Sequence, residues 1–241
     1  MRRYFVGLLL FGFAHLAMGY SFTLNQIEWN SWPEYCKAKY VVTNVGEVSP
    51  FARQVSPDTI AKWKGRLGET WWNIHHGCAG MIWIVRAEKL EGKNAQQYQF
   101  AIKRAHDEAE YSLQRTPQTD PLYGKFIAVQ ARVAYAVGQG EQAIKLLRAS
   151  IKNAPEVADS YAVLATFLYK QGKFAEARAV LEDGIAKVKP PTAEMHYFLG
   201  LILVKQKDYA PAEVQAKAAY ALGYPLPGLK NKLKAAGHWS Q

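Results

Sequence analysis

Apolar and small residues recur at a fixed spacing in the second half of the chain. Ala131, Ala165 and Gly200 occupy equivalent positions, which are separated by 34 and then 35 residues. A period of roughly 20–50 residues is typical of stacked repeat arrays. The pattern therefore predicts three structural repeats. Six further sets of positions keep the same spacing: Ile127, Tyr161 and His196; Ala134, Leu168 and Leu203; Gly138, Gly172 and Lys207; Gly140, Phe174 and Tyr209; Ala143, Ala177 and Ala212; and Leu147, Leu181 and Ala216.

Each repeat predicts two helices joined by a tight turn. Within a unit, the apolar residues follow the 3.6-residue period of a helix, which is interrupted at Gly138, Gly172 and Lys207. One helix pair cannot bury its own apolar face, so we expect neighbouring pairs to stack and form the core together. The sequence thus predicts an all-α fold. The predicted helices cover residues 126–137, 141–153, 158–170, 174–188, 193–205 and 209–222.

These positions resemble the tetratricopeptide repeat family over roughly residues 124–226. The middle unit carries the pattern Tyr161-x-x-Leu164-Ala165-x-x-Leu168-x-x-x-Gly172-x-Phe174-x-x-Ala177-x-x-x-Leu181. The chain departs from the family pattern at Gln130, Gly140 and Lys207, and these departures affect the expected turn geometry. The resemblance implies a right-handed α-solenoid of helix-turn-helix repeats, whose first helices line a concave groove that binds a peptide or protein.

The chain before the repeats has a different pattern. Helical spacing predicts a helix that begins near residue 56, a second at 70–90 and a third at 95–115. Six of the seven tryptophans lie in this half, and we expect their large rings to fill its core. A glycan- or peptidoglycan-binding platform is the alternative role for the same rings. The six tryptophans are Trp29, Trp32, Trp63, Trp71, Trp72 and Trp83.

The first nineteen residues have the order of a secretory signal peptide. Arg2 and Arg3 precede a short apolar run, and Ala17-Met18-Gly19 ends the segment with small residues. We expect cleavage after Gly19, with an uncleaved membrane anchor as the alternative. No later stretch approaches the roughly 20 apolar residues of a membrane span. The sequence therefore predicts a periplasmic or secreted protein that is soluble after cleavage.

Cys36 and Cys78 are the only cysteines. An even number of cysteines in an exported chain indicates a disulfide, which here would close a loop worth about 3–4 kcal/mol. The alternative is a metal site, because His75 stands three residues before Cys78 and Cys36 could supply a third ligand. We expect the disulfide, no metal and no cofactor.

Composition and motifs narrow the class of function. The chain has 241 residues, with 30 Lys and Arg against 20 Asp and Glu, and a formal net charge of +10. It has no Gly-rich phosphate loop, no GxSxG and no HExxH, so we expect no catalytic activity. The positive charge favours an acidic partner, and export argues against nucleic acid.

The sequence therefore predicts a non-catalytic periplasmic scaffold for protein–protein interaction, within a cell-envelope assembly such as secretion, pilus or wall biogenesis. The resemblance places one side-chain stripe in the groove, where its cations would meet an acidic peptide and its tyrosines would offer aromatic faces. This stripe comprises Lys125, Arg132, Tyr135, Thr166, Tyr169, Lys170, Tyr197, Leu201 and Lys205. The predicted organisation is a signal peptide at 1–19, an irregular segment at 20–55, a helical cap or degenerate repeat at 56–120, the repeats at 121–225 and a C-terminal capping helix at 226–241.

Overall fold

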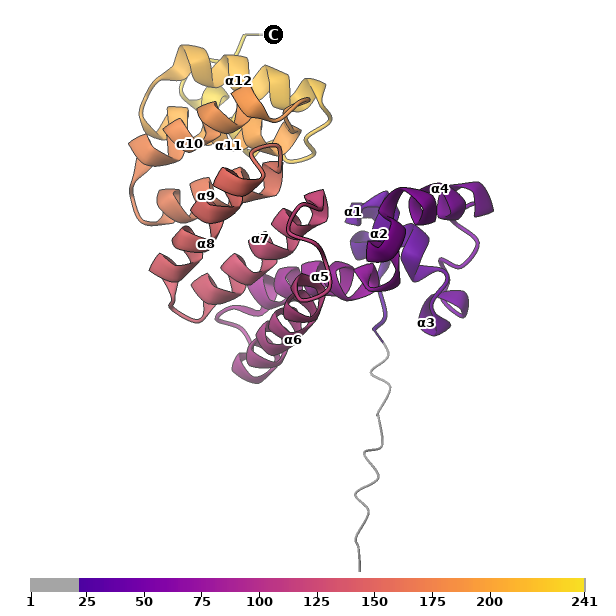
Figure 1. Ribbon diagram of the computed structural model, residues 1–241. Helices are drawn as coiled ribbons and strands as arrows, with labels where there is room; N and C mark the ends of the chain where they lie inside the picture. The colour runs from indigo at the N-terminus through magenta and orange to yellow at the C-terminus, as the bar shows by residue number, and fades with distance from the viewer. Residues whose placement is uncertain (1–21, 241) are drawn as a thin grey trace, which may run out of the picture.

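The computed structural model describes residues 22–240, so the predicted signal peptide lies outside the described residues. Thirteen α-helices and one 3₁₀ helix make up this range, and it contains no strand. The protein is an all-α solenoid of stacked helix pairs. Figure 1 shows these pairs curving away from a lobe of short N-terminal helices, with the C terminus at the far end of the arc.

The repeat half consists of six α-helices and a short seventh. Their positions agree closely with the hydrophobic pattern, because the predicted small residues lie where helices cross: Ala131, Ala143, Ala177 and Ala212 are completely buried. These side chains let the helix backbones approach closely. The helices are α7 (Pro121–Ala136), α8 (Gly140–Asn153), α9 (Ala158–Lys170), α10 (Phe174–Lys187), α11 (Ala193–Lys205), α12 (Tyr209–Ala221) and α13 (Gly228–Ala235).

Two details of the repeat half differ from the prediction. α7 begins at Pro121 rather than at 126, because Asp120 caps it by accepting a hydrogen bond from the Leu122 amide at 2.8 Å. The C-terminal capping helix, predicted at 226–241, covers only Gly228–Ala235: it buries Leu229 and Leu233, whereas Leu226 precedes it and is 55% exposed.

The tight turns keep one backbone conformation in all three repeats. Gly138 and Gly172 have φ values of 84° and 77°, in the left-handed region that glycine adopts easily. Lys207 occupies the third equivalent position and has φ of 62°. The departure from glycine at this position therefore leaves the turn geometry intact.

The N-terminal half contains the remaining helices. The segment expected to be irregular includes three short helices, α1 (Gln26–Ser31), α2 (Glu34–Tyr40) and α3 (Asn44–Glu47). Capping residues begin two of these helices: Asn25 and Thr43 accept hydrogen bonds from backbone amides in the first turns of α1 and α3. The other helices are α4 (Pro57–Leu67), the 3₁₀ helix η1 (Gly68–Trp72), α5 (Ile74–Leu90) and α6 (Ala95–Leu113).

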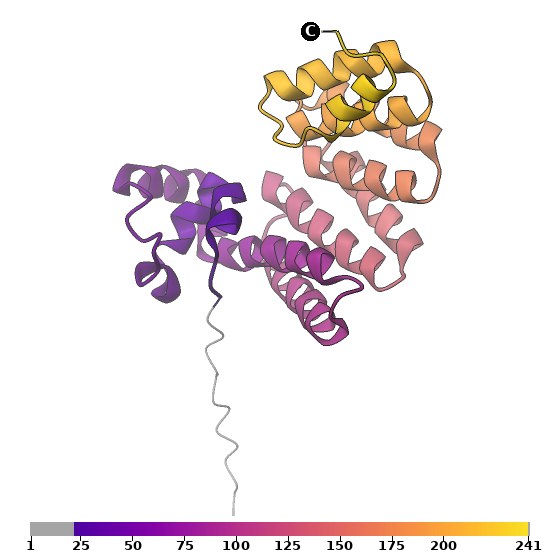
Figure 2. The same ribbon diagram turned by 180° about the vertical axis from the view of Figure 1, so that it is seen from behind.

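α5 and α6 connect the lobe to the repeats. Ala79, Ile84 and Ala105 from this pair share one apolar cluster with Val129 and Val133 of α7. The reverse view in Figure 2 shows the same order, with the short helices on one side and the repeats continuing from α5 and α6. The pair therefore extends the solenoid by one layer at its N-terminal end.

The cysteines and most tryptophans form the core of the N-terminal lobe. Cys36 of α2 and Cys78 of α5 form a disulfide and are both fully buried. Trp29, Trp32 and Trp71 are between 3% and 5% exposed.

No helix within residues 22–240 has the length and apolar character needed to cross a bilayer.

Candidate functional site

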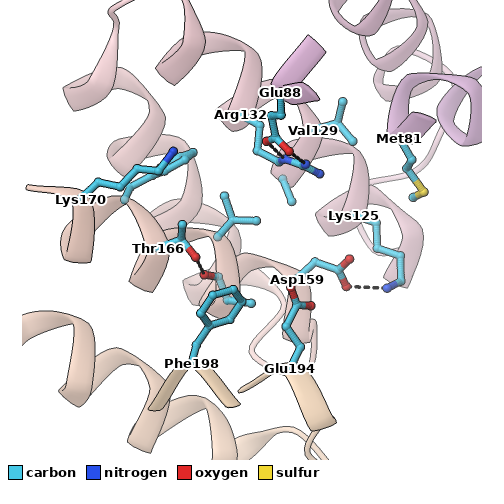
Figure 3. Close-up of a pocket in the computed structure, with 14 residues that line it drawn as sticks. Met81, Glu88, Lys125, Val129, Arg132, Asp159, Thr166, Lys170, Glu194 and Phe198 are labelled. Atoms are coloured by element: carbon cyan, nitrogen blue, oxygen red, sulfur yellow. Dashed lines mark hydrogen bonds and ion pairs between the residues drawn. The ribbon is translucent and has the colours of Figure 1, made fainter. Parts of the chain in front are cut away.

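A pocket of about 280 Å³ lies on the inner side of the solenoid, where four successive first helices meet. α5, α7, α9 and α11 each contribute side chains to it (Figure 3). The lining mixes charged and apolar groups. The lining residues are Met81, Glu88, Lys125, Ala128, Val129, Arg132, Asp159, Ala162, Val163, Thr166, Phe167, Lys170, Glu194 and Phe198. We call this pocket the charged groove.

Two ion pairs cross the charged groove and join neighbouring helices. The ammonium group of Lys125 on α7 donates to a carboxylate oxygen of Asp159 on α9. The guanidinium of Arg132 donates two hydrogen bonds to Glu88 of α5, at 2.9 Å and 2.5 Å. Such a two-point contact fixes the side-chain planes relative to each other. Lys125 and Arg132, which we expected to bind an acidic peptide, therefore already pair with carboxylates of the protein itself.

Glu194 is the third carboxylate of the charged groove and lies in the first turn of α11. Figure 3 shows its side chain reaching towards Asp159. The residue is exposed to solvent at the surface, although the walls of the groove lie around its carboxyl. Partial desolvation by these walls raises the pKa of the Glu194 carboxyl, and the negative charge of Asp159 acts in the same direction. The positive charges of Arg132 and Lys125 oppose them.

Aromatic rings occupy the opposite end of the groove. Tyr135 stacks on Phe167 with ring centroids 4.0 Å apart, and the Lys170 ammonium lies 5.5 Å from the centroid of the Tyr135 ring. Within the described part of the chain, Lys170 has no carboxylate partner in an ion pair. The arrangement leaves one cation at this end, held over an aromatic face.

A second, smaller pocket of about 120 Å³ continues the inner face towards the C terminus. It shares Thr166 and Phe198 with the charged groove, and carbon atoms make up most of its lining. We call it the apolar socket. Its lining residues are Ala165, Thr166, Tyr169, Phe198, Leu201, Ile202 and Lys232.

The structure brings most of the predicted stripe together, with three exceptions. Tyr135 lines neither pocket, although its ring stacks on Phe167, which lines the charged groove. Tyr197 is only 7% exposed, because it stacks on Tyr224 at 4.0 Å and belongs to the core. Its hydroxyl also lies close to Gly228 of α13. Lys205 lines neither pocket, and its ammonium lies 5.7 Å from the Phe174 ring. Tyr197 is therefore corrected from a groove residue to a core residue.

The sequence also missed residues that line the charged groove. Glu88 and Met81 come from α5, which the pattern assigned to a cap or a degenerate repeat and for which it named no groove residue. Phe198 follows Tyr197 along α11, but it points into the groove whereas Tyr197 points away from it. Phe198 stands three residues before Leu201, which belonged to the predicted stripe, and this spacing could have signalled a shared helix face.

The structure does not arrange His75, Cys78 and Cys36 as the metal site that was the alternative to a disulfide. The disulfide takes the sulfur atoms of Cys36 and Cys78, so neither thiolate is available as a ligand. His76 instead pairs with Glu108, with 2.7 Å between Nδ1 and a carboxylate oxygen. Glu108 is 8% exposed and also accepts from Arg104. No group of three or more potential metal ligands occurs within residues 22–240.

The tryptophans offer little exposed aromatic surface. Trp29, Trp32, Trp71 and Trp83 are buried in the cores, and Trp63 donates from its ring nitrogen to Glu34 at 2.7 Å. Trp72 is the exception among the six, since 57% of it is exposed. Only one ring of the cluster is therefore open to a ligand.

The fold and the groove define a class of protein: a helical-repeat scaffold whose inner face presents pockets to a partner. By sequence, residues 134–202 match the model of the tetratricopeptide repeat, so α8 to α10 and most of α11 have the sequence as well as the architecture of that family. Tetratricopeptide repeats are generally non-catalytic and mediate protein–protein interactions. No curated protein matches the chain.

Proposed function

We propose that this protein is a non-catalytic scaffold of the cell envelope, which holds a peptide segment of a partner protein on the inner face of its solenoid. The supporting observation is the continuity of the charged groove and the apolar socket across α5, α7, α9 and α11. A peptide lying across these helices contacts several repeats at once, which is how stacked repeats build an extended binding surface.

Position-resolved photo-crosslinking tests this proposal. A photoreactive amino acid replaces Val163, which lines the charged groove, or Lys145, which is exposed on the outer helix α8. We expect a crosslinked partner from position 163 in living cells and none from position 145. Crosslinks from position 145 alone would place the partner on the outer face and contradict the proposal.

Export to the periplasm is part of the proposal and has two supports. One is the basic, then apolar, then small-residue order of residues 1–19. The other is the buried disulfide, since disulfides persist in oxidising compartments. Mass spectrometry of the protein from fractionated cells is the test. We expect the N terminus at Tyr20 and the protein in the periplasmic fraction. An intact Met1 in a membrane fraction would instead favour the uncleaved anchor.

Glycan binding through the tryptophans has weaker support, because Trp72 alone of the N-terminal six has most of its surface exposed. Co-sedimentation with purified peptidoglycan distinguishes the two functions. We expect no pelleting of the protein. Pelleting that is lost in Trp72→Ala and retained in Trp63→Phe would revive the glycan alternative.

A further inference from the structure

The charged side chains of the groove differ in whether they already form an ion pair within the protein. Six charged side chains line it, three of each sign. Two of the cations are engaged internally, since Lys125 pairs with Asp159 and Arg132 pairs with Glu88. An acidic partner would have to displace these carboxylates before it could reach either of these two cations. The third cation, Lys170, has no carboxylate partner among the described residues, but it lies over the Tyr135 ring at the opposite end of the groove from Glu194.

Glu194 is in the opposite situation. Among the described residues it takes part in no ion pair and accepts no hydrogen bond from a side chain, although it lies beside Asp159 (Figure 3). Desolvation and the charge of Asp159 raise the pKa of Glu194. The positive charges of Arg132 and Lys125 lower it, but their combined effect is smaller, and each of these cations already pairs with another carboxylate. The anionic form of Glu194 is therefore only partly compensated there. A further cation at this position would relieve the repulsion.

The surroundings of Glu194 specify more than charge. Phe198 lies one helical turn further along α11 and separates Glu194 from the apolar socket, whose wall it also forms. The socket has room for a single side chain. A partner that places a cation at Glu194 can therefore place a neighbouring apolar side chain in the socket.

We propose that the inner face selects a basic peptide segment, in which a Lys or Arg pairs with Glu194 beside Asp159 and a nearby apolar side chain enters the apolar socket. This inference rests on the proposed function of the groove and specifies the chemistry of its partner. It reverses the expectation of an acidic partner. An Arg suits the site particularly well, because its planar guanidinium can donate to two carboxylates at once.

The strength of the contact follows from its environment. A charge pair in a concave, partly desolvated site contributes more than one on an open surface. Removal of the Glu194 charge leaves the cation of the peptide without its partner, and because Glu194 is exposed to solvent we expect affinity for a basic peptide to fall about twofold to fivefold. Affinity for a peptide that uses only the socket is expected to stay the same.

The experiment is a selection from a display library of random twelve-residue peptides against the disulfide-bonded chain, followed by fluorescence-anisotropy titration of the selected peptides. The test variant is Glu194→Gln, which keeps the size of the side chain and removes its charge. The matched control is Glu141→Gln, on an exposed position of the outer helix α8. Circular dichroism checks that both variants fold.

The expected result is enrichment of Lys or Arg at a fixed distance from an aliphatic or aromatic residue, with binding weakened by Glu194→Gln and unchanged by Glu141→Gln. Enrichment of acidic peptides, or of basic peptides indifferent to Glu194→Gln, would overturn the inference. A further variant, Val163→Trp, fills the charged groove and separates the two proposals. If the selected peptides are acidic and Val163→Trp weakens their binding, the groove still binds peptides and only the preference for a basic peptide is wrong. If the selected peptides bind all variants equally, both proposals are wrong.

Discussion

Arg132 of α7 donates two hydrogen bonds to Glu88 of α5, from Nε to Oε1 at 2.9 Å and from Nη2 to Oε2 at 2.5 Å. The contact joins the first predicted repeat to a helix that the sequence assigned to a cap or a degenerate repeat. It therefore makes α5 part of the inner wall of the solenoid and removes Arg132 from the set of free cations.

The Arg132–Glu88 pair is expected to contribute modestly to stability. The side chain of Glu88 is 50% exposed and that of Arg132 is 24% exposed, so solvent screens the attraction. A double-mutant cycle with Arg132→Ala, Glu88→Ala and the double variant should give a coupling free energy of about 0.5–1 kcal/mol in urea unfolding. Purely additive effects of the two substitutions would show that the pair does not stabilise the fold.

The disulfide is expected to contribute strongly to the stability of the N-terminal lobe. It connects positions 42 residues apart, and the entropy that it removes from the unfolded chain corresponds to about 3–4 kcal/mol. Urea unfolding should show a loss of this size when both Cys36 and Cys78 are replaced by Ala. A reductant should lower the midpoint of the natural protein and leave that of the variant unchanged. Equal midpoints for the oxidised protein and the variant would contradict the prediction.

Gly77 permits the close approach of α5 to α7. A Cβ atom at this position would lie 2.0 Å from a ring carbon of Phe126, which is completely buried. Gly77→Ala is therefore expected to destabilise the protein by about 1–3 kcal/mol. Gly65→Ala is the matched control, because Gly65 lies within α4 and a Cβ there meets no atom within 4 Å. The control should stabilise the protein by about 0.5–1 kcal/mol, owing to the higher helix propensity of alanine. Similar effects at both positions would refute the packing argument.

His75 makes the stability of the lobe depend on pH. Burial lowers its pKa to about 4, the positive charges of His76 and Lys39 act in the same direction, and Glu108 opposes them. In the unfolded chain the histidine titrates near 6.5, so between pH 6.5 and 4 the unfolded state binds a proton that the folded state does not. Stability from this group is therefore complete above about pH 6.5 and decreases as the pH falls towards 4, by up to about 3 kcal/mol.

Urea unfolding at pH 7, 5.5 and 4 measures this dependence. His75→Gln should flatten the decrease, because it removes the titrating group. His106→Gln is the control, since the side chain of His106 is 53% exposed. Parallel pH profiles for the natural protein and His75→Gln would assign the decrease to other groups.

Much of the repeat fold was readable from the sequence, because the signal is local. Helix periodicity and the recurrence of Ala131, Ala165 and Gly200 depend only on spacing along one chain, and the structure buries all three at helix crossings. The pairing of Cys36 with Cys78 was equally determined, since a chain with two cysteines allows one intramolecular disulfide.

The site was less predictable, because its electrostatics depend on neighbours distant in sequence. Arg132 and Glu88 lie 44 residues apart in the sequence. Lys125 and Asp159 lie 34 residues apart. A local sequence pattern therefore cannot predict that these two cations form ion pairs. Glu108 illustrates the same point, because it is buried between His76, which lies 32 residues away on α5, and Arg104 of its own helix.

The sequence alone determined that this chain forms stacked helix pairs, because periodicity fixes which face of each helix must be buried. Only the tertiary structure decided which charges of the inner face remain open to a partner. The physical reason is that ion pairing and desolvation are properties of the space between helices. That space exists only once α5, α7, α9 and α11 have packed, and among the described residues it leaves Glu194 as the carboxylate of the groove that forms no ion pair.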